Sequence, residues 1–140
     1  MIYVDTSVLA AYYCPEPLSG QAQGALAQED ERAISSLVEL EFVSAIARKV
    51  RTHEMRRGDA HRILAAFHSH LEQGIYTRLA VDGAHFAKAR AWLASLVVPL
   101  QTLEALHVAL AATKGCAVLT ADAVLAKACA KVGVKARLIA

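Results

Sequence analysis

Short apolar segments alternate with longer segments of helical periodicity along the whole chain, and this alternation restricts the possible folds more than any other feature. The short segments contain Ile, Val or Leu and are bounded by turn residues, which predicts strands at residues 2–4, 32–35, 116–120 and 134–139. The longer segments predict helices at residues 5–14, within 15–30, and at 36–55, 58–75, 82–98, 102–115 and 121–133. Strands that alternate with amphipathic helices are typical of an α/β domain with a mainly parallel sheet.

Length and composition narrow the class of protein. The 140 residues are enough for one hydrophobic core, so we expect a single domain over residues 1–140. A content of 56% hydrophobic and 20% charged residues excludes a disordered chain. No apolar run reaches the roughly 20 residues of a membrane helix, and the first residues do not resemble a signal peptide. We therefore expect a cytoplasmic protein with no membrane partner.

Four stretches place an acidic residue in mostly apolar surroundings: IYVDTS, SSLVELEFVSAI, LQTLEALHVALA and AVLTADAVLA. Asp5 and Asp122 each follow a predicted strand, so both are expected at the edge of the sheet where ligands bind in α/β proteins. Carboxylates that converge on a small volume repel one another unless a hard cation balances their charge. The sequence therefore predicts an acidic site for Mg²⁺ or Mn²⁺.

Each acid also has a purely structural interpretation. Asp5 and Asp122 precede helices and could be N-caps. Glu104 could be a favourable charge in the first turn of its helix. Glu39 and Glu41 could both be solvated, and because they are two positions apart on a helix they cannot share one face. Periodicity alone does not choose between these two glutamates.

Taken together and in this order, the four stretches resemble the motifs of the PIN domain family, and in particular the VapC-type toxins of bacterial toxin–antitoxin pairs. The matching segments are YVDTSVLAAYYCPE, ISSLVELEFVSAIARK, LQTLEALHVALAA and VLTADAVLAKACAKVGV. The resemblance covers nearly the whole chain. It implies a three-layer α/β/α fold and a Mg²⁺- or Mn²⁺-dependent endoribonuclease.

The resemblance also implies a role for individual residues. Asp5 would be the first metal ligand, and Glu41, six residues after Ser35, would be the second. Asp122 would be the acid of the last motif. The third motif departs from the family, which usually has Asp where this chain has Glu104; the extra methylene changes the reach of the carboxylate by about 1.5 Å. Hydroxyl groups suited to bind a carboxylate or a metal-bound water belong to Thr6, Ser7 and Thr120, although capping or a surface position is an alternative for each.

A phosphodiester resists attack by water because it is anionic, and divalent ions held by these acids would neutralise it and orient a water for in-line displacement. A carboxylate could accept the proton of that water, and no protein nucleophile is needed. His107 lies among apolar residues and is expected to be a core or interface histidine. The resemblance further implies a homodimer and a cognate VapB-like antitoxin that covers the site.

Basic residues are concentrated between positions 48 and 62, in the stretch ARKVRTHEMRRGDAHR. This cluster can contact RNA phosphates without reading sequence. A solvated helix end is the alternative interpretation. The residues expected to contact RNA are Arg48, Lys49, Arg51, Arg56 and Arg57, with Arg62, His53 and His61 nearby.

Two other functions remain open from the sequence. A haloacid-dehalogenase-type phosphatase also begins with a strand that ends in Asp, but that class usually has a second Asp two residues later, where this chain has Ser7. A non-catalytic PIN-like module that binds RNA or a protein partner is the second alternative, and Glu104 keeps it open.

Overall fold

The computed structural model describes residues 1–140 and contains five strands and seven helices. The strands are β1 (Ile2–Val4), β2 (Arg32–Ser35), β3 (Tyr76–Leu79), β4 (Ala117–Thr120) and β5 (Ala136–Leu138). The helices are α1 (Thr6–Tyr13), α2 (Ser19–Ala27), α3 (Ser36–Arg51), α4 (Arg57–Glu72), α5 (Gly83–Ala94), α6 (Thr102–Lys114) and α7 (Ala123–Lys131).

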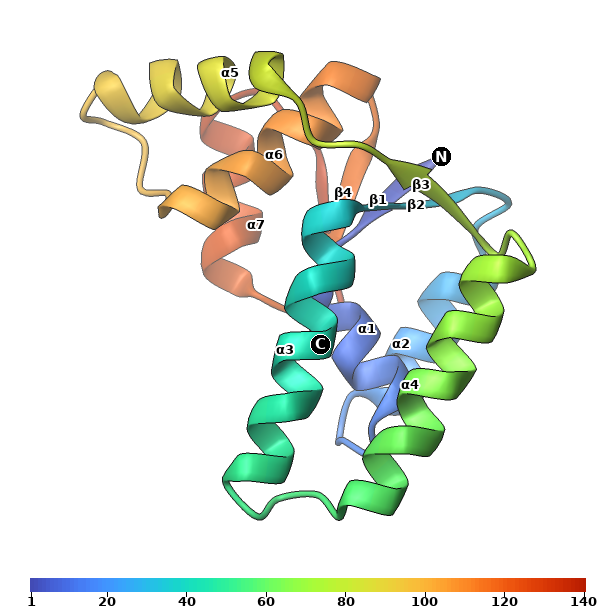
Figure 1. The fold of residues 1–140 in the computed structure, drawn as a ribbon. Coiled ribbons are helices and arrows are strands. Elements are labelled where there is room, and N and C mark those ends of the chain that lie inside the picture. Colours follow the sequence, from blue (N-terminus) through green and yellow to red (C-terminus); the bar gives the residue numbers. More distant parts are fainter.

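The five strands form one sheet in the order β3-β2-β1-β4-β5, and every neighbouring pair is parallel. Helices α1 to α4 gather on one side of the sheet and helices α5 to α7 on the other (Figure 1). This arrangement follows from right-handed crossovers, because the chain moves outward from β1 to β3 and then returns to add β4 and β5 on the opposite side of β1. The expected α/β class with a parallel sheet is confirmed.

The strand order reverses between β1 and β4, which pair in register from Ile2 with Ala117 to Val4 with Leu119. In open α/β sheets such a reversal leaves a crevice beyond the carboxyl ends of the two strands. Asp5 follows β1 and Asp122 follows β4. Both acids therefore lie at the switch point of the sheet.

The core is built on the short central strands and on the helix faces that cover them. All three residues of β1 are buried, and so are the last three residues of β4. Phe42 of α3 is fully buried and packs against Tyr13 and Phe67, with ring centroids 5.3 and 4.6 Å apart. These aromatic contacts fix α3 and α4 relative to α1.

The strand β3 was not expected from the sequence. Thr77 and Arg78 at its centre are polar, and only Tyr76 and Leu79 at its ends are buried. The strand lies at the edge of the sheet, where solvent covers part of its surface, so its sequence lacks the continuous apolar character of a central parallel strand.

Two helices end four residues earlier than expected. The helix predicted to reach residue 55 ends at Arg51, because His53 has a φ of 61° and the amides of Glu54 and Met55 turn back to the carbonyl of Lys49. The helix predicted to reach residue 98 ends at Ala94, and Leu96 has a φ of 64°. A left-handed residue stops an α-helix.

The three cysteines are free, and no helix has both the length and the apolar character that crossing a membrane requires. Cys14 and Cys129 are buried among apolar residues, and Cys116 is half-buried.

Candidate functional site: four carboxylates at the switch point of the sheet

Asp5 is held at the end of β1 by two hydroxyl groups. Its side chain is buried, with 7% of the residue surface exposed. Oδ2 accepts hydrogen bonds from Ser7 Oγ at 2.7 Å and Thr120 Oγ1 at 2.9 Å. Asp5 occupies the N-cap position of α1, but its side chain makes no capping hydrogen bond. Oδ1 accepts no hydrogen bond from the protein.

Glu41 reaches the same region from α3. Its Oε1 accepts a hydrogen bond from Thr6 Oγ1 at 3.0 Å and also contacts Nε2 of His107. Burial alone would raise the pKa of Glu41, but the hydrogen bonds from His107 and Thr6 lower it. The carboxylate is therefore kept ionised, and its Oε2 has no protein partner.

His107 is buried, with 3% of its surface exposed, and both of its nitrogens have partners. Nδ1 lies 2.6 Å from the Tyr3 hydroxyl, which in turn lies 2.8 Å from Ser35 Oγ. The expectation of a core histidine is confirmed. Its contact with Glu41 and the participation of Tyr3 were not anticipated, and the only signal for Tyr3 is a hydroxyl-bearing ring in an otherwise aliphatic strand.

Asp122 combines both interpretations that the sequence allowed. Its Oδ1 caps α7, accepting hydrogen bonds from the amides of Val124 at 2.8 Å and Leu125 at 3.2 Å. The residue is exposed, and Oδ2 is left without a protein hydrogen bond. Capping therefore orients the carboxylate through Oδ1 and leaves Oδ2 available to a ligand.

Glu104 differs from the other three acids because neither of its oxygens accepts a hydrogen bond from the protein. Its pKa is raised by partial burial and by the negative charges of Asp122 and Asp5, while His107 opposes the shift. These influences show that the substituted acid of the third motif lies in the field of the two strand-end aspartates.

Three of the four carboxylates thus share one arrangement, in which one oxygen is anchored by two hydrogen bonds and the other is free. Free carboxylate oxygens are the donors that Mg²⁺ and Mn²⁺ prefer. No three His, Cys, Asp or Glu side chains are close enough to enclose an ion. Magnesium commonly keeps several waters and is bound by only one or two carboxylates, so individually anchored acids with free oxygens fit it.

The raised pKa of Glu104 leads to a prediction for the metal-free protein. A carboxyl group with a higher pKa in the folded than in the unfolded state costs stability as the pH rises through its unfolded pKa, and the full cost is present above its folded pKa. We expect Glu104→Gln to remove this cost at pH 7 and to raise the free energy of unfolding by about 1 kcal/mol or less, since solvent partly screens the site. The gain should vanish below about pH 4, where the carboxyl is neutral in both states.

Urea unfolding of chelator-treated protein at pH 7 and pH 4 measures this difference. A Glu104→Gln variant that is less stable than the wild type at both pH values would contradict the like-charge field described for this residue.

Glu39 lies apart from the acidic site. Its carboxylate pairs with the guanidinium of Arg78 on β3, at 2.7 and 3.1 Å. The two glutamates of α3 therefore have separate partners: Glu39 belongs to the edge of the sheet, and Glu41 faces the switch point.

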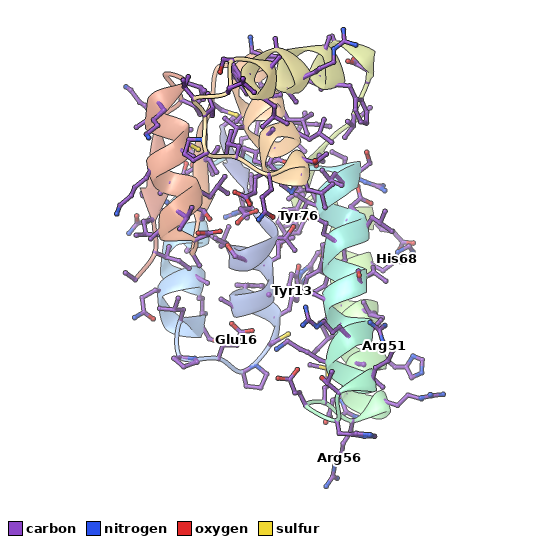
Figure 2. All side chains as sticks on the ribbon, turned by 90° about the vertical axis from the view of Figure 1, so that its left-hand side faces the viewer. Tyr13, Glu16, Arg51, Arg56, His68 and Tyr76 are labelled. Carbon is purple, nitrogen blue, oxygen red and sulfur yellow. The ribbon has the colours of Figure 1, made fainter.

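Most of the basic residues between positions 48 and 62 line two neighbouring cavities, which share Lys49 and Glu54. Arg48 and Lys49 line a groove of about 920 Å³ along α3 that also contains Thr6 and Glu41. Arg56 and Arg57 line a different cavity at the far ends of α3 and α4, and Arg56 projects from the turn between these helices (Figure 2). Arg51 lines neither. Lys49 has a partner in Glu16, 3.6 Å away, which leaves Arg48 as the unpaired cation of the groove beside Glu41.

Comparisons with known proteins place this geometry in context. The family model described as PIN domain matches residues 2–131. Among solved structures, VapC20 from Mycobacterium tuberculosis, described as a sarcin-ricin loop cleaving toxin, is 20% identical, and the match covers 96% of each chain with a TM-score of 0.75.

Two further solved structures are complexes. In VapBC2 from Rickettsia felis, bound to a DNA fragment from its promoter, the matching chain is 14% identical, with 99% of this chain and 98% of that chain covered and a TM-score of 0.71. In FitAcB from Neisseria gonorrhoeae the matching chain is 18% identical, with 97% of this chain and 96% of that chain covered and a TM-score of 0.69. No curated protein matches the sequence significantly. At these identities the solved structures establish a shared fold.

Proposed function

The chain belongs to the PIN domain family, and on this premise we propose that it is a metal-dependent endoribonuclease, the toxin of a VapBC-type toxin–antitoxin pair. The observation that carries the proposal is the set of acids near the switch point, in which Asp5, Glu41 and Asp122 each keep one carboxylate oxygen free of protein hydrogen bonds. None of these free oxygens is buried without a partner, so each is open to solvent and available to a divalent ion.

The residues suited to hold Mg²⁺ or Mn²⁺ are Asp5, Glu41, Asp122 and Glu104. When bound, a divalent ion supplies neutralisation of the phosphate charge and a lower pKa for a bound water. Ser7, Thr120 and Thr6 keep two of these carboxylates in place by donating to Asp5 and Glu41. One carboxylate can accept the proton that the attacking water loses.

RNA is the proposed substrate, and a VapB-like protein is the proposed partner. One solved structure of the same fold is described as a toxin that cleaves the sarcin-ricin loop, and others are toxin–antitoxin complexes bound to DNA. By analogy with these proteins, we propose that this chain cuts a structured RNA in the cytoplasm, forms a homodimer and is inhibited by an antitoxin that covers the acids.

The test is cleavage of total bacterial RNA by purified, antitoxin-free protein in Mg²⁺, in Mn²⁺ and in excess chelator. We expect discrete fragments with either ion and none with chelator, and restored cleavage when Mg²⁺ is added back. RNA that stays intact under all conditions, although the protein is folded and binds it, would instead support the non-catalytic alternative. Glu104 in place of the family's usual Asp is the observation that keeps that alternative in view. Membership of the PIN family excludes the phosphatase.

The groove along α3 leads to a prediction about RNA binding. Arg48 lies in the groove with Glu41 and has no acidic partner, whereas Arg51 lies outside it. We expect Arg48→Ala to weaken RNA binding and to lower the slope of log affinity against log salt by about one, as for the loss of one phosphate contact.

Arg51→Ala is the comparison variant, because it removes the same charge from the same helix. Its salt slope should change less than that of Arg48→Ala. Fluorescence anisotropy with labelled RNA at several salt concentrations, in chelator to prevent cleavage, measures both. Equal losses in the two variants would mean that the groove does not guide the RNA.

A further inference from the structure

A closed chain of buried hydrogen bonds connects the start of α3 to the glutamate on its second turn. The amide of Val38 donates to Ser35 Oγ at 3.1 Å, and Ser35 Oγ lies 2.8 Å from the Tyr3 hydroxyl. That hydroxyl lies 2.6 Å from Nδ1 of His107, and Nε2 of His107 contacts Oε1 of Glu41. The chain thus passes from α3 through the last residue of β2, then through β1 and α6, and returns to α3.

One arrangement of hydrogens satisfies every member of this chain with a neutral imidazole. Nε2 must carry the hydrogen, because Oε1 of an ionised Glu41 can only accept. Nδ1 then accepts from the Tyr3 hydroxyl, and Tyr3 accepts from Ser35, whose oxygen already receives the amide of Val38. Tyr3 therefore selects the tautomer of His107 that donates to Glu41.

We propose that His107, with its tautomer set by Tyr3, is a positioning residue that holds Glu41 so that the free Oε2 meets the divalent ion. The inference rests on the proposed metal-dependent function. Thr6 donates to the same Oε1 at 3.0 Å, so two donors restrain one oxygen and leave the other unengaged. A glutamate side chain has three rotatable bonds, and restraining them before the ion arrives reduces the entropy lost on binding.

His107→Phe and Tyr3→Phe test the chain because both keep a ring of similar size. Removal of a group that supports a metal ligand typically lowers metal affinity by about 10–100-fold. We expect a weakening in this range for His107→Phe and a smaller one for Tyr3→Phe, measured as Mn²⁺ binding by electron paramagnetic resonance without RNA. His107→Gln carries a donor and an acceptor on one amide and is expected to restore most of the affinity. RNA cleavage should follow the same order.

Matched controls separate positioning from general loss of core packing. His85 is also a buried histidine, but it belongs to the capping box of α5. Tyr76 is also a buried tyrosine, and its hydroxyl bonds to Tyr13. His85→Phe and Tyr76→Phe are expected to lower the melting temperature and to leave Mn²⁺ affinity at the wild-type value.

The outcomes distinguish this inference from the proposed function. If the wild type binds Mn²⁺ and cleaves RNA but His107→Phe and Tyr3→Phe do so equally well, the positioning role is wrong and the function stands. If the wild type neither binds Mn²⁺ nor cleaves RNA, both are overturned. If His107→Phe fails to fold, Tyr3→Phe and His107→Gln decide the question. A wild-type Mn²⁺ affinity in Tyr3→Phe overturns the inference. A Mn²⁺ affinity in His107→Gln that is no higher than in Glu41→Gln also overturns it.

Discussion

Replacing Asp5 with asparagine is expected to lower metal-dependent RNA cleavage by more than about 100-fold while the protein stays folded. The amide oxygen of asparagine can accept the hydrogen bonds that Ser7 and Thr120 now donate to Oδ2. The amide nitrogen must then occupy the position of the free Oδ1, so a donor replaces a potential metal ligand. Loss of a group that only supports a ligand costs about 10–100-fold, and loss of a ligand is expected to cost more.

The matched control for this substitution is Asp82→Asn. Asp82 caps α5 through hydrogen bonds to the amides of Ala84 and His85, and asparagine caps helices about as well as aspartate. Initial rates of cleavage at saturating Mg²⁺, with thermal melts of both variants, make the comparison. Asp5→Asn that cleaves at the wild-type rate would remove Asp5 from the site, and Asp82→Asn that is equally inactive would point to an indirect effect of charge.

Replacing Phe42 with alanine is expected to have the largest effect on stability, a loss of about 3–5 kcal/mol. Phe42 is fully buried, and its ring packs between Tyr13 of α1 and Phe67 of α4. Alanine would leave a cavity where three helices meet, and these neighbours can collapse into it only in part. The loss is a large fraction of the 5–15 kcal/mol that is typical of a folded domain.

Urea unfolding followed by circular dichroism measures this loss, and Val43→Ala is the control on the same helix. Val43 is 43% exposed, so its truncation is expected to cost about 0.5 kcal/mol or less. Because Phe42 is adjacent to Glu41, the folded fraction of Phe42→Ala should also bind Mn²⁺ more weakly. Similar costs for the two variants would mean that the aromatic cluster does not anchor α3.

The central strands and the positions of the strand-end acids could be predicted from local sequence. Ile2–Val4 is a short apolar run followed directly by Asp5, Ala117–Thr120 is a mostly apolar run followed after Ala121 by Asp122, and the structure places the two strands side by side at the switch point. The strand Tyr76–Leu79 could not be predicted in the same way. An edge strand needs few apolar residues, and the polar residues Thr77 and Arg78 interrupt the apolar pattern from which a strand would be predicted.

In the candidate site, too, features set by neighbouring residues could be predicted, and contacts between residues far apart in the sequence could not. That Asp122 could cap a helix is visible in the residues after it, and the structure shows this cap. The contact between His107 and Glu41 joins residues 66 positions apart. It depends on how α6 packs on the side of the sheet opposite to α3, which no local pattern specifies, and the motif resemblance alone selected Glu41 over Glu39.

The pairing of β1 with β4 also determines when the acidic site can exist during synthesis. Thr120 holds Asp5 across 115 positions of sequence, and Asp122 follows only after β4 has been made. A ribosome adds about 5–20 residues per second, so a growing chain carries Asp5 for several seconds before the residues that complete its surroundings emerge. A chain truncated before β4 would retain the first three motifs but would lack Thr120 and Asp122, so its set of acids would be incomplete. The segment from Asp5 to Asp122 must therefore be synthesised in full before the set of acids is complete, and assembly of the site requires β4 to pair with β1.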